Sequence, residues 1–75
     1  MKRKTTRLEK EVFLFLNDLR DSGETNMFGA APYIQEEFEV DKSTSRKLLT
    51  IWMDNFNDSG EYDEINNNHE PINID

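Results

Sequence analysis

Six polar residues near the middle of the chain have the side chains that a protein reading double-stranded DNA needs. They are Lys42, Ser43, Thr44, Arg46, Lys47 and Thr50. Lysine and arginine neutralise phosphates, while guanidinium and hydroxyl groups can hydrogen-bond to base edges in the major groove. The chemistry that these residues indicate is therefore duplex binding. The same residues would also suit the solvated face of an ordinary helix.

The sequence offers little for catalysis. Its single histidine, His69, lies in a weakly patterned C-terminal segment, which a histidine-based relay would have to recruit. Glu36 and Glu37 are adjacent, and adjacent side chains on a helix point about 100° apart, so they do not form an organised pair of carboxylates. The chain contains no cysteine, and its three glycines are scattered. We therefore predict no enzymatic activity, no metal site and no cofactor.

Basic residues are concentrated in two places in a chain whose net charge is −7. Residues 1–10 contain five Lys or Arg against one acid, and residues 41–53 contain three against one. Residues 11–40 contain seven acids against one base, and residues 54–75 contain seven acids and no Lys or Arg. The two basic blocks favour local contact with DNA. The total charge opposes tight non-specific binding and favours a protein partner.

The six polar residues need a helix to present them, and the apolar spacing predicts one. One face of this helix would carry Ser45, Leu48, Leu49, Trp52 and Phe56. That face should pack in the core around Trp52, which leaves Arg46, Lys47 and Thr50 pointing away from it. Ile51 lies off the stripe and is expected to extend an interaction surface.

A tight turn is predicted to lead into this helix. Val40 should point inward, and Asp41 or Ser43 should cap the first turn of the helix. Glu39 stands where glycine is usual in such turns, so a left-handed backbone there would be strained. The helix should end near Phe56 or Asn57.

Two further helices are predicted before the turn. The first runs from residue 6 or 7 to residue 22, because apolar residues recur there at helical spacing. Thr6 and Glu9 have the spacing of a capping box, and Gly23 suits a left-handed helix end. The second helix should start between residues 27 and 31 and end near residue 38.

Phe13 and Leu14 do not fit the apolar stripe of the first helix. Two explanations stay open at this point. Either the helix is covered on several sides, including by the C-terminal segment, or these two residues form a dimer surface. The second explanation predicts a homodimer.

The predicted fold class is all-α, with one small core. Residues 1–6 would form a mobile basic arm, residues 7–57 a three-helix domain with a helix-turn-helix-like core, and residues 58–75 an acidic tail that is disordered or loosely draped over the domain. In the arm, Lys2, Arg3 and Lys4 would follow phosphates or enter the minor groove. A plain three-helix bundle with a basic surface is the alternative to helix-turn-helix geometry.

Two resemblances to known proteins add to these predictions. Residues 38–49, FEVDKSTSRKLL, resemble the turn and recognition helix of bacterial helix-turn-helix regulators. Two positions differ from the usual pattern: Glu39 replaces a glycine, and Ser45 replaces a branched apolar residue. Small uncharacterised proteins of tailed bacteriophages resemble LRDSG at residues 19–23, TNMFGAAPY at residues 25–33 and the stretch at residues 46–53. The second resemblance spans roughly residues 8–56 and implies a viral protein in the host cytoplasm. It transfers no site residues.

Two functions of different classes follow. The first is a small phage protein that is DNA-binding or regulatory and has no enzymatic activity. The second is an interaction module that binds a host or phage protein through its acidic surface. No membrane association is expected in either case, because the longest wholly apolar run, residues 12–16, is far too short to cross a bilayer.

Overall fold

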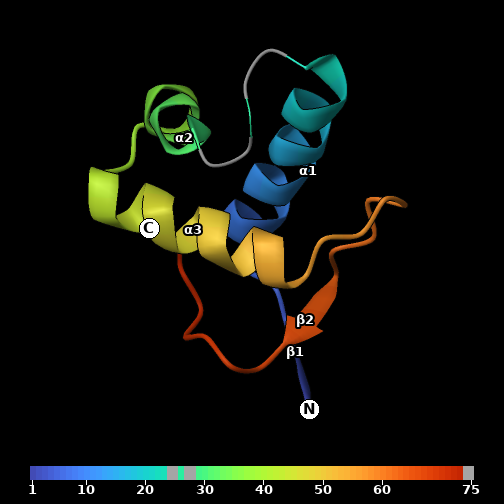
Figure 1. The fold of residues 1–75 in the computed structure, drawn as a ribbon. Helices are drawn as coiled ribbons and strands as arrows, with labels where there is room; N and C mark the ends of the chain where they lie inside the picture. Colours follow the sequence, from blue (N-terminus) through green and yellow to red (C-terminus); the bar gives the residue numbers. More distant parts are fainter. Residues whose placement is uncertain (24–25, 27–28, 74–75) are drawn as a thin grey trace.

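Three helices and one short antiparallel pair of strands make up the structure, a computed structural model that describes residues 1–23, 26 and 29–73. In chain order the elements are β1 (Lys2–Lys4), α1 (Arg7–Ser22), α2 (Ala31–Phe38), α3 (Lys42–Asp54) and β2 (Glu64–Asn66). The helices surround the core, and the two strands lie near the C-terminal end of α3 (Figure 1). Within the described residues, no helix is long and apolar enough to cross a membrane.

The predicted caps of α1 are confirmed. The Thr6 hydroxyl accepts a hydrogen bond from the Glu9 backbone N–H at 3.1 Å, and the Glu9 carboxylate accepts one from the Thr6 N–H at 2.9 Å. At the other end, Gly23 takes a left-handed conformation with φ 70°, and its N–H bonds to the Arg20 carbonyl. These local hydrogen bonds satisfy backbone groups that the helix itself leaves without partners.

The turn between α2 and α3 also forms as predicted. Val40 is buried, and the Asp41 carboxylate accepts a hydrogen bond from the Thr44 N–H at 2.7 Å. Glu39 adopts φ 54° and ψ 44°, the left-handed conformation that was expected to be strained for a residue with a Cβ. α2 begins at Ala31, the last residue of the predicted interval, of which residues 27 and 28 lie outside the described part of the chain. α3 ends at Asp54, slightly before the predicted end.

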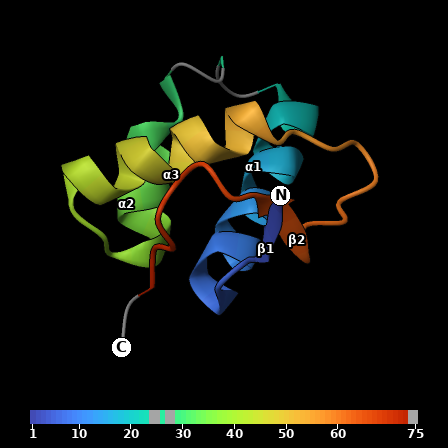
Figure 2. The same cartoon turned by 90° about the horizontal axis from the view of Figure 1, so that it is seen from below.

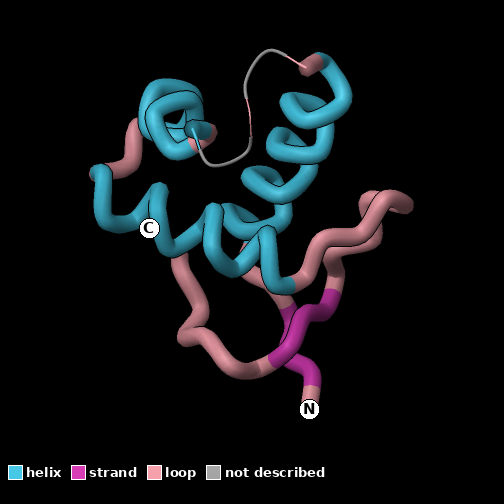
Figure 3. Tube along the Cα trace, viewed as in Figure 1, coloured by secondary structure: helices cyan, strands magenta, loops and turns pink. Residues whose placement is uncertain are grey.

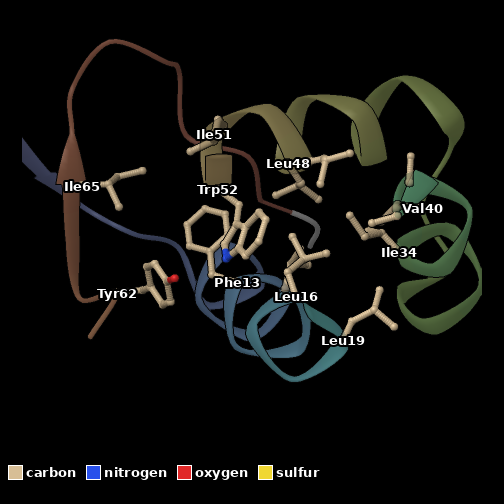
Figure 4. Packing of buried hydrophobic residues seen from close by; sticks show 14 residues of the cluster. Phe13, Leu16, Leu19, Ile34, Val40, Leu48, Ile51, Trp52, Tyr62 and Ile65 are labelled. Atoms are coloured by element: carbon tan, nitrogen blue, oxygen red, sulfur yellow. The ribbon is translucent and has the colours of Figure 1, made fainter. Parts of the chain in front are cut away.

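The core lies between the three helices and the C-terminal segment (Figure 4). Trp52 and Leu16 are buried at its centre, as their spacing predicts. Phe56, expected in the core, is instead 37% exposed at its margin, where its ring packs edge-to-face on Trp52 at a centroid distance of 5.2 Å. The interpretation of Ile51 as surface was wrong, because this side chain is only 1% exposed.

The prediction of a disordered tail is wrong for residues 58–73. Tyr62 and Ile65 are each only 1% exposed, so this segment completes the core. The Tyr62 ring packs against Phe13 at 5.3 Å, and its hydroxyl donates a hydrogen bond to the Asn17 side-chain oxygen at 2.7 Å. Phe13 is therefore covered by the protein's own C-terminal segment and does not form a surface. The composition of the segment concealed this, because two buried apolar side chains suffice to anchor a mostly polar chain.

The N-terminal arm is ordered as well, and it adds a short two-stranded sheet to the three helices, so the all-α prediction is confirmed only in part. β1 pairs antiparallel with β2, with Lys2 opposite Asn66 and Lys4 opposite Glu64. Two further hydrogen bonds extend the pairing at its ends, from the Asn67 N–H to the Met1 carbonyl at 2.9 Å and from the Thr5 N–H to the Asp63 carbonyl at 3.0 Å. Because side chains alternate along a strand, β1 directs Lys2 and Lys4 to solvent and the residue between them inward.

Burial of Tyr62 gives a direct test of the C-terminal segment. Tyr62→Ala should lower the free energy of unfolding by about 3–5 kcal/mol, the usual cost of truncating a buried aromatic ring. Tyr33→Ala is the matched control, because Tyr33 is 37% exposed on α2. Chemical denaturation of both variants measures the difference. Equal midpoints would show that the segment contributes nothing to the core.

The left-handed backbone at Glu39 predicts a stabilising substitution. Glu39→Gly should raise the free energy of unfolding by up to about 1 kcal/mol, because glycine relieves the strain of the left-handed backbone. The greater entropy of glycine in the unfolded chain opposes this effect and limits its size. Gly23→Ala should have the opposite effect of about 1 kcal/mol, since no atom lies within 4 Å of the added Cβ and only the φ of +70° opposes it. Thermal melts that show the same sign for both changes would contradict this.

Candidate nucleic-acid interface

The outer side of α3 carries all six residues that the sequence assigned to DNA. Lys42, Ser43, Arg46, Lys47 and Thr50 are exposed, and Thr44 is half-buried. The helix turns them outward because Leu48, Leu49 and Trp52 occupy the core side. Ser45 is fully buried, and its hydroxyl bonds to the Lys42 carbonyl at 2.8 Å, which supplies the partner that a buried polar group needs.

The three bases of α3 differ electrostatically from the other helical bases. Lys42, Arg46 and Lys47 form no ion pair with any described residue. The bases on α1 are all paired: Arg7 with Glu11, Lys10 with Asp63, and Arg20 with Asp21 and Asp58. Positive charge without an ion-pair partner is therefore concentrated on α3 and on the outward side of β1.

Two clefts divide the polar side of α3 into two edges. A cleft of about 680 Å³ lies between α2 and α3, and Lys42, Arg46 and Thr50 line it from α3. We call these three residues the open edge. A second cleft of about 560 Å³ lies between α3 and residues 68–73, and Thr44 and Lys47 line it. We call these two residues the covered edge. Nothing in the sequence indicated this division.

The N-terminal arm keeps exposed only two of the three bases that were predicted to contact DNA. Arg3 is held by Glu9, with Nη1 donating to Oε1 at 2.9 Å and Nη2 to Oε2 at 2.8 Å, and its side chain is only 10% exposed. This guanidinium is therefore not free to contact a phosphate. Lys2 and Lys4 remain exposed. β1 lies away from the start of α3 in both views, so the structure does not bring these lysines beside Lys42 (Figures 1 and 2).

Glu9 is the most buried charged group among the described residues. Besides Arg3 and the Thr6 N–H, its carboxylate accepts a hydrogen bond from the Ile72 N–H at 3.2 Å. Burial by itself raises the pKa of Glu9. The hydrogen bonds from Arg3, Thr6 and Ile72 and the charge of Arg3 outweigh burial, and they hold the pKa of Glu9 below its usual range. The sequence predicted Glu9 as a cap, but its spacing to Arg3 carries no recognisable signal.

Self-association stays a prediction that now depends on a single residue. Leu14 is 40% exposed on α1, whereas its predicted companion Phe13 is buried. Sedimentation of the wild type and of Leu14→Ser at micromolar concentration would test it. A monomeric wild type would exclude the predicted homodimer under those conditions.

Neither a metal site nor membership of a known protein family is supported by the structure or by comparison with known proteins. Within the part of the chain that the structure describes, no group of three His, Asp or Glu side chains is placed to hold a metal ion. Comparisons with protein-family models, with curated proteins and with solved structures gave no match. The resemblance to proteins of tailed bacteriophages therefore stays a prediction from the sequence.

The Arg3–Glu9 pair predicts an acid-sensitive contribution to stability. Because folding lowers the pKa of Glu9, the contribution is complete above the unfolded pKa of about 4.3 and is lost as the pH falls through the folded pKa. Glu9→Gln should cost about 3 kcal/mol at pH 7, since it leaves the guanidinium of Arg3 without its charge partner. Denaturation of the wild type and the variant from pH 7 to pH 3 should show this difference shrinking. The control is Glu11→Gln, an exposed neighbour that should change little at any pH, and a difference for Glu9→Gln that is independent of pH would contradict the assignment.

Proposed function

We propose that this protein binds double-stranded DNA through the outer side of α3 and acts as a small non-enzymatic, helix-turn-helix regulatory protein. The observation that carries the proposal is the set of three exposed bases on α3 without ion-pair partners among the described residues. In a chain of net charge −7, neighbouring acids neutralise the helical bases elsewhere. Bases left available on one helical face are what phosphate contact requires.

The arrangement of α2 and α3 supports the same proposal. α3 follows α2 after a three-residue turn and packs inward along its apolar stripe. An α-helix with its side chains is about 10–12 Å across, and the major groove of B-DNA is about 12 Å wide. In helix-turn-helix proteins the N-terminal residues of the recognition helix contact base edges. Lys42, Ser43 and Arg46 lie at that end of α3.

The biological setting rests on the sequence resemblance alone. We propose a protein of a tailed bacteriophage that acts in the host cytoplasm, with duplex DNA as its partner. Fractionation of infected cells, followed by detection of the protein, would test the location. Recovery only from the cell envelope would contradict it.

One observation favours the second class of function, an interaction module. Glu36, Glu37 and Glu39 are exposed along α2 and around its end, and no described residue forms an ion pair with them. A basic segment of a host or phage protein would complement this surface. The acidic face and the basic face lie on consecutive helices, so the two functions would use different residues.

A duplex titration at two salt concentrations tests the DNA proposal. Arg46→Ala should weaken duplex binding and flatten the slope of log affinity against log salt by about 0.9 for each phosphate that the protein no longer neutralises. The melting temperature should not fall, because Arg46 is exposed and has no ion-pair partner among the described residues. Arg7→Ala removes the same charge from an exposed site on α1 and is the matched control.

The DNA proposal fails if the wild type shows no salt-sensitive binding to any duplex, or if Arg7→Ala weakens binding as much as Arg46→Ala. A poly-lysine peptide then tests the second class. Binding of that peptide by the wild type, reduced by Glu36→Gln and Glu37→Gln, would support the interaction module.

A further inference from the structure

The C-terminal segment returns from β2 along α3. Figure 2 shows it crossing beside the helix, and Figure 3 shows that it has no regular secondary structure after β2. Its residues 68–73 form one wall of the cleft that Thr44 and Lys47 line from α3. This segment therefore faces, across that cleft, the covered edge of the helix that the proposed function directs at DNA. We call residues 67–73 the C-terminal strap.

The strap is attached at three points. At its start, the Asn67 N–H donates a hydrogen bond to the Met1 carbonyl at 2.9 Å. At His69 the backbone carbonyl accepts a hydrogen bond from Arg3 Nε at 3.0 Å, and the ring Nε2 lies 2.9 Å from the Asp54 carboxylate. At Ile72 the backbone bonds in both directions, accepting from the Thr6 hydroxyl and donating to Glu9. The Ile72 side chain also packs against the margin of the core. These few contacts hold the strap in place without burying it.

The position of the strap conflicts with full insertion of α3 into DNA. The major groove is about as wide as one helix with its side chains, so it cannot also admit an extended segment lying against that helix. Glu70 belongs to the same wall and adds a negative charge where Lys47 would meet a phosphate. The open edge, which the cleft between α2 and α3 borders, has neither obstacle.

We propose that the C-terminal strap is an autoinhibitory element, which withholds Thr44 and Lys47 from the duplex until it leaves α3. The proposal rests on the function proposed above and specifies its regulation. The open edge makes the first contact with DNA through Lys42 and Arg46. Displacement of the strap then adds Lys47, which converts a weak complex into a tighter one.

Full-length variants that loosen the strap without altering the acidic or basic residues test this. The double variant His69→Ala/Ile72→Ser removes both side-chain attachments and retains every Asp, Glu, Lys and Arg. It should bind a duplex about tenfold more tightly at pH 8, because one charge-assisted phosphate contact becomes available. Thermal melts establish that the double variant is folded before binding is measured.

The decisive comparison is Lys47→Ala in the two backgrounds. In the wild type the affinity should change by less than about twofold, because the strap keeps Lys47 from reaching a phosphate. In the loosened background Lys47→Ala should abolish the gain and flatten the salt slope by about 0.9. Arg46→Ala is the control, since it lies on the open edge and should cost the same factor in both backgrounds.

Hydrogen exchange of the free proteins gives a second readout that needs no duplex. The backbone N–H of residue 72, bonded to Glu9, should have a high protection factor in the wild type and a lower one in the double variant. Unchanged or increased protection would overturn the proposal, as would an equal cost of Lys47→Ala in both backgrounds. Absence of duplex binding by every variant would instead remove the proposed function, and the strap's role with it.

Discussion

The buried carboxylate of Glu9 connects the two ends of the chain to the first turn of α1. It caps the helix through Thr6, pairs with Arg3 from the N-terminal strand and accepts the Ile72 N–H from the C-terminal segment. Burying a carboxylate is costly unless its oxygens accept hydrogen bonds. The burial of Glu9 is therefore favourable only when Thr6, Arg3 and Ile72 are all in place. Among the described residues, no buried side-chain nitrogen or oxygen lacks a partner.

A second polar side chain performs the same task at the other side of the core. The Asn17 oxygen accepts hydrogen bonds from the Trp52 indole N–H at 2.9 Å and from the Tyr62 hydroxyl, while its amide donates to the Asn57 carbonyl at 2.9 Å. One amide on α1 thus fixes the orientation of two large aromatic side chains from α3 and from the C-terminal segment. Directional bonds of this kind select one packing arrangement among several that apolar contacts alone would allow.

The features that could be predicted from the sequence are those that depend on interactions between residues close together along the chain. The helices, the cap at Asp41 and the burial of Val40 depend on residues a few positions apart, and periodicity and capping patterns report such contacts directly. The strand pair and the burial of Tyr62 join segments far apart along the chain, for which one sequence contains no local signal. Ile51 was misplaced for the same reason, because α3 is covered on a second side by a segment whose composition is polar. The outer side of α3 was predicted, but its division into two edges was not.

The contacts of α1 with the C-terminal segment also have a consequence for how the protein is made. Synthesis proceeds from the N-terminus, so α1 emerges with Glu9 long before Ile72, and with Phe13 long before the Tyr62 ring that covers it. Contacts between such distant residues slow folding, since a long loop must close before they form. The nascent chain therefore exposes one apolar side of α1 until residues 62–72 have been synthesised. A product that terminates before Tyr62 would have an open core.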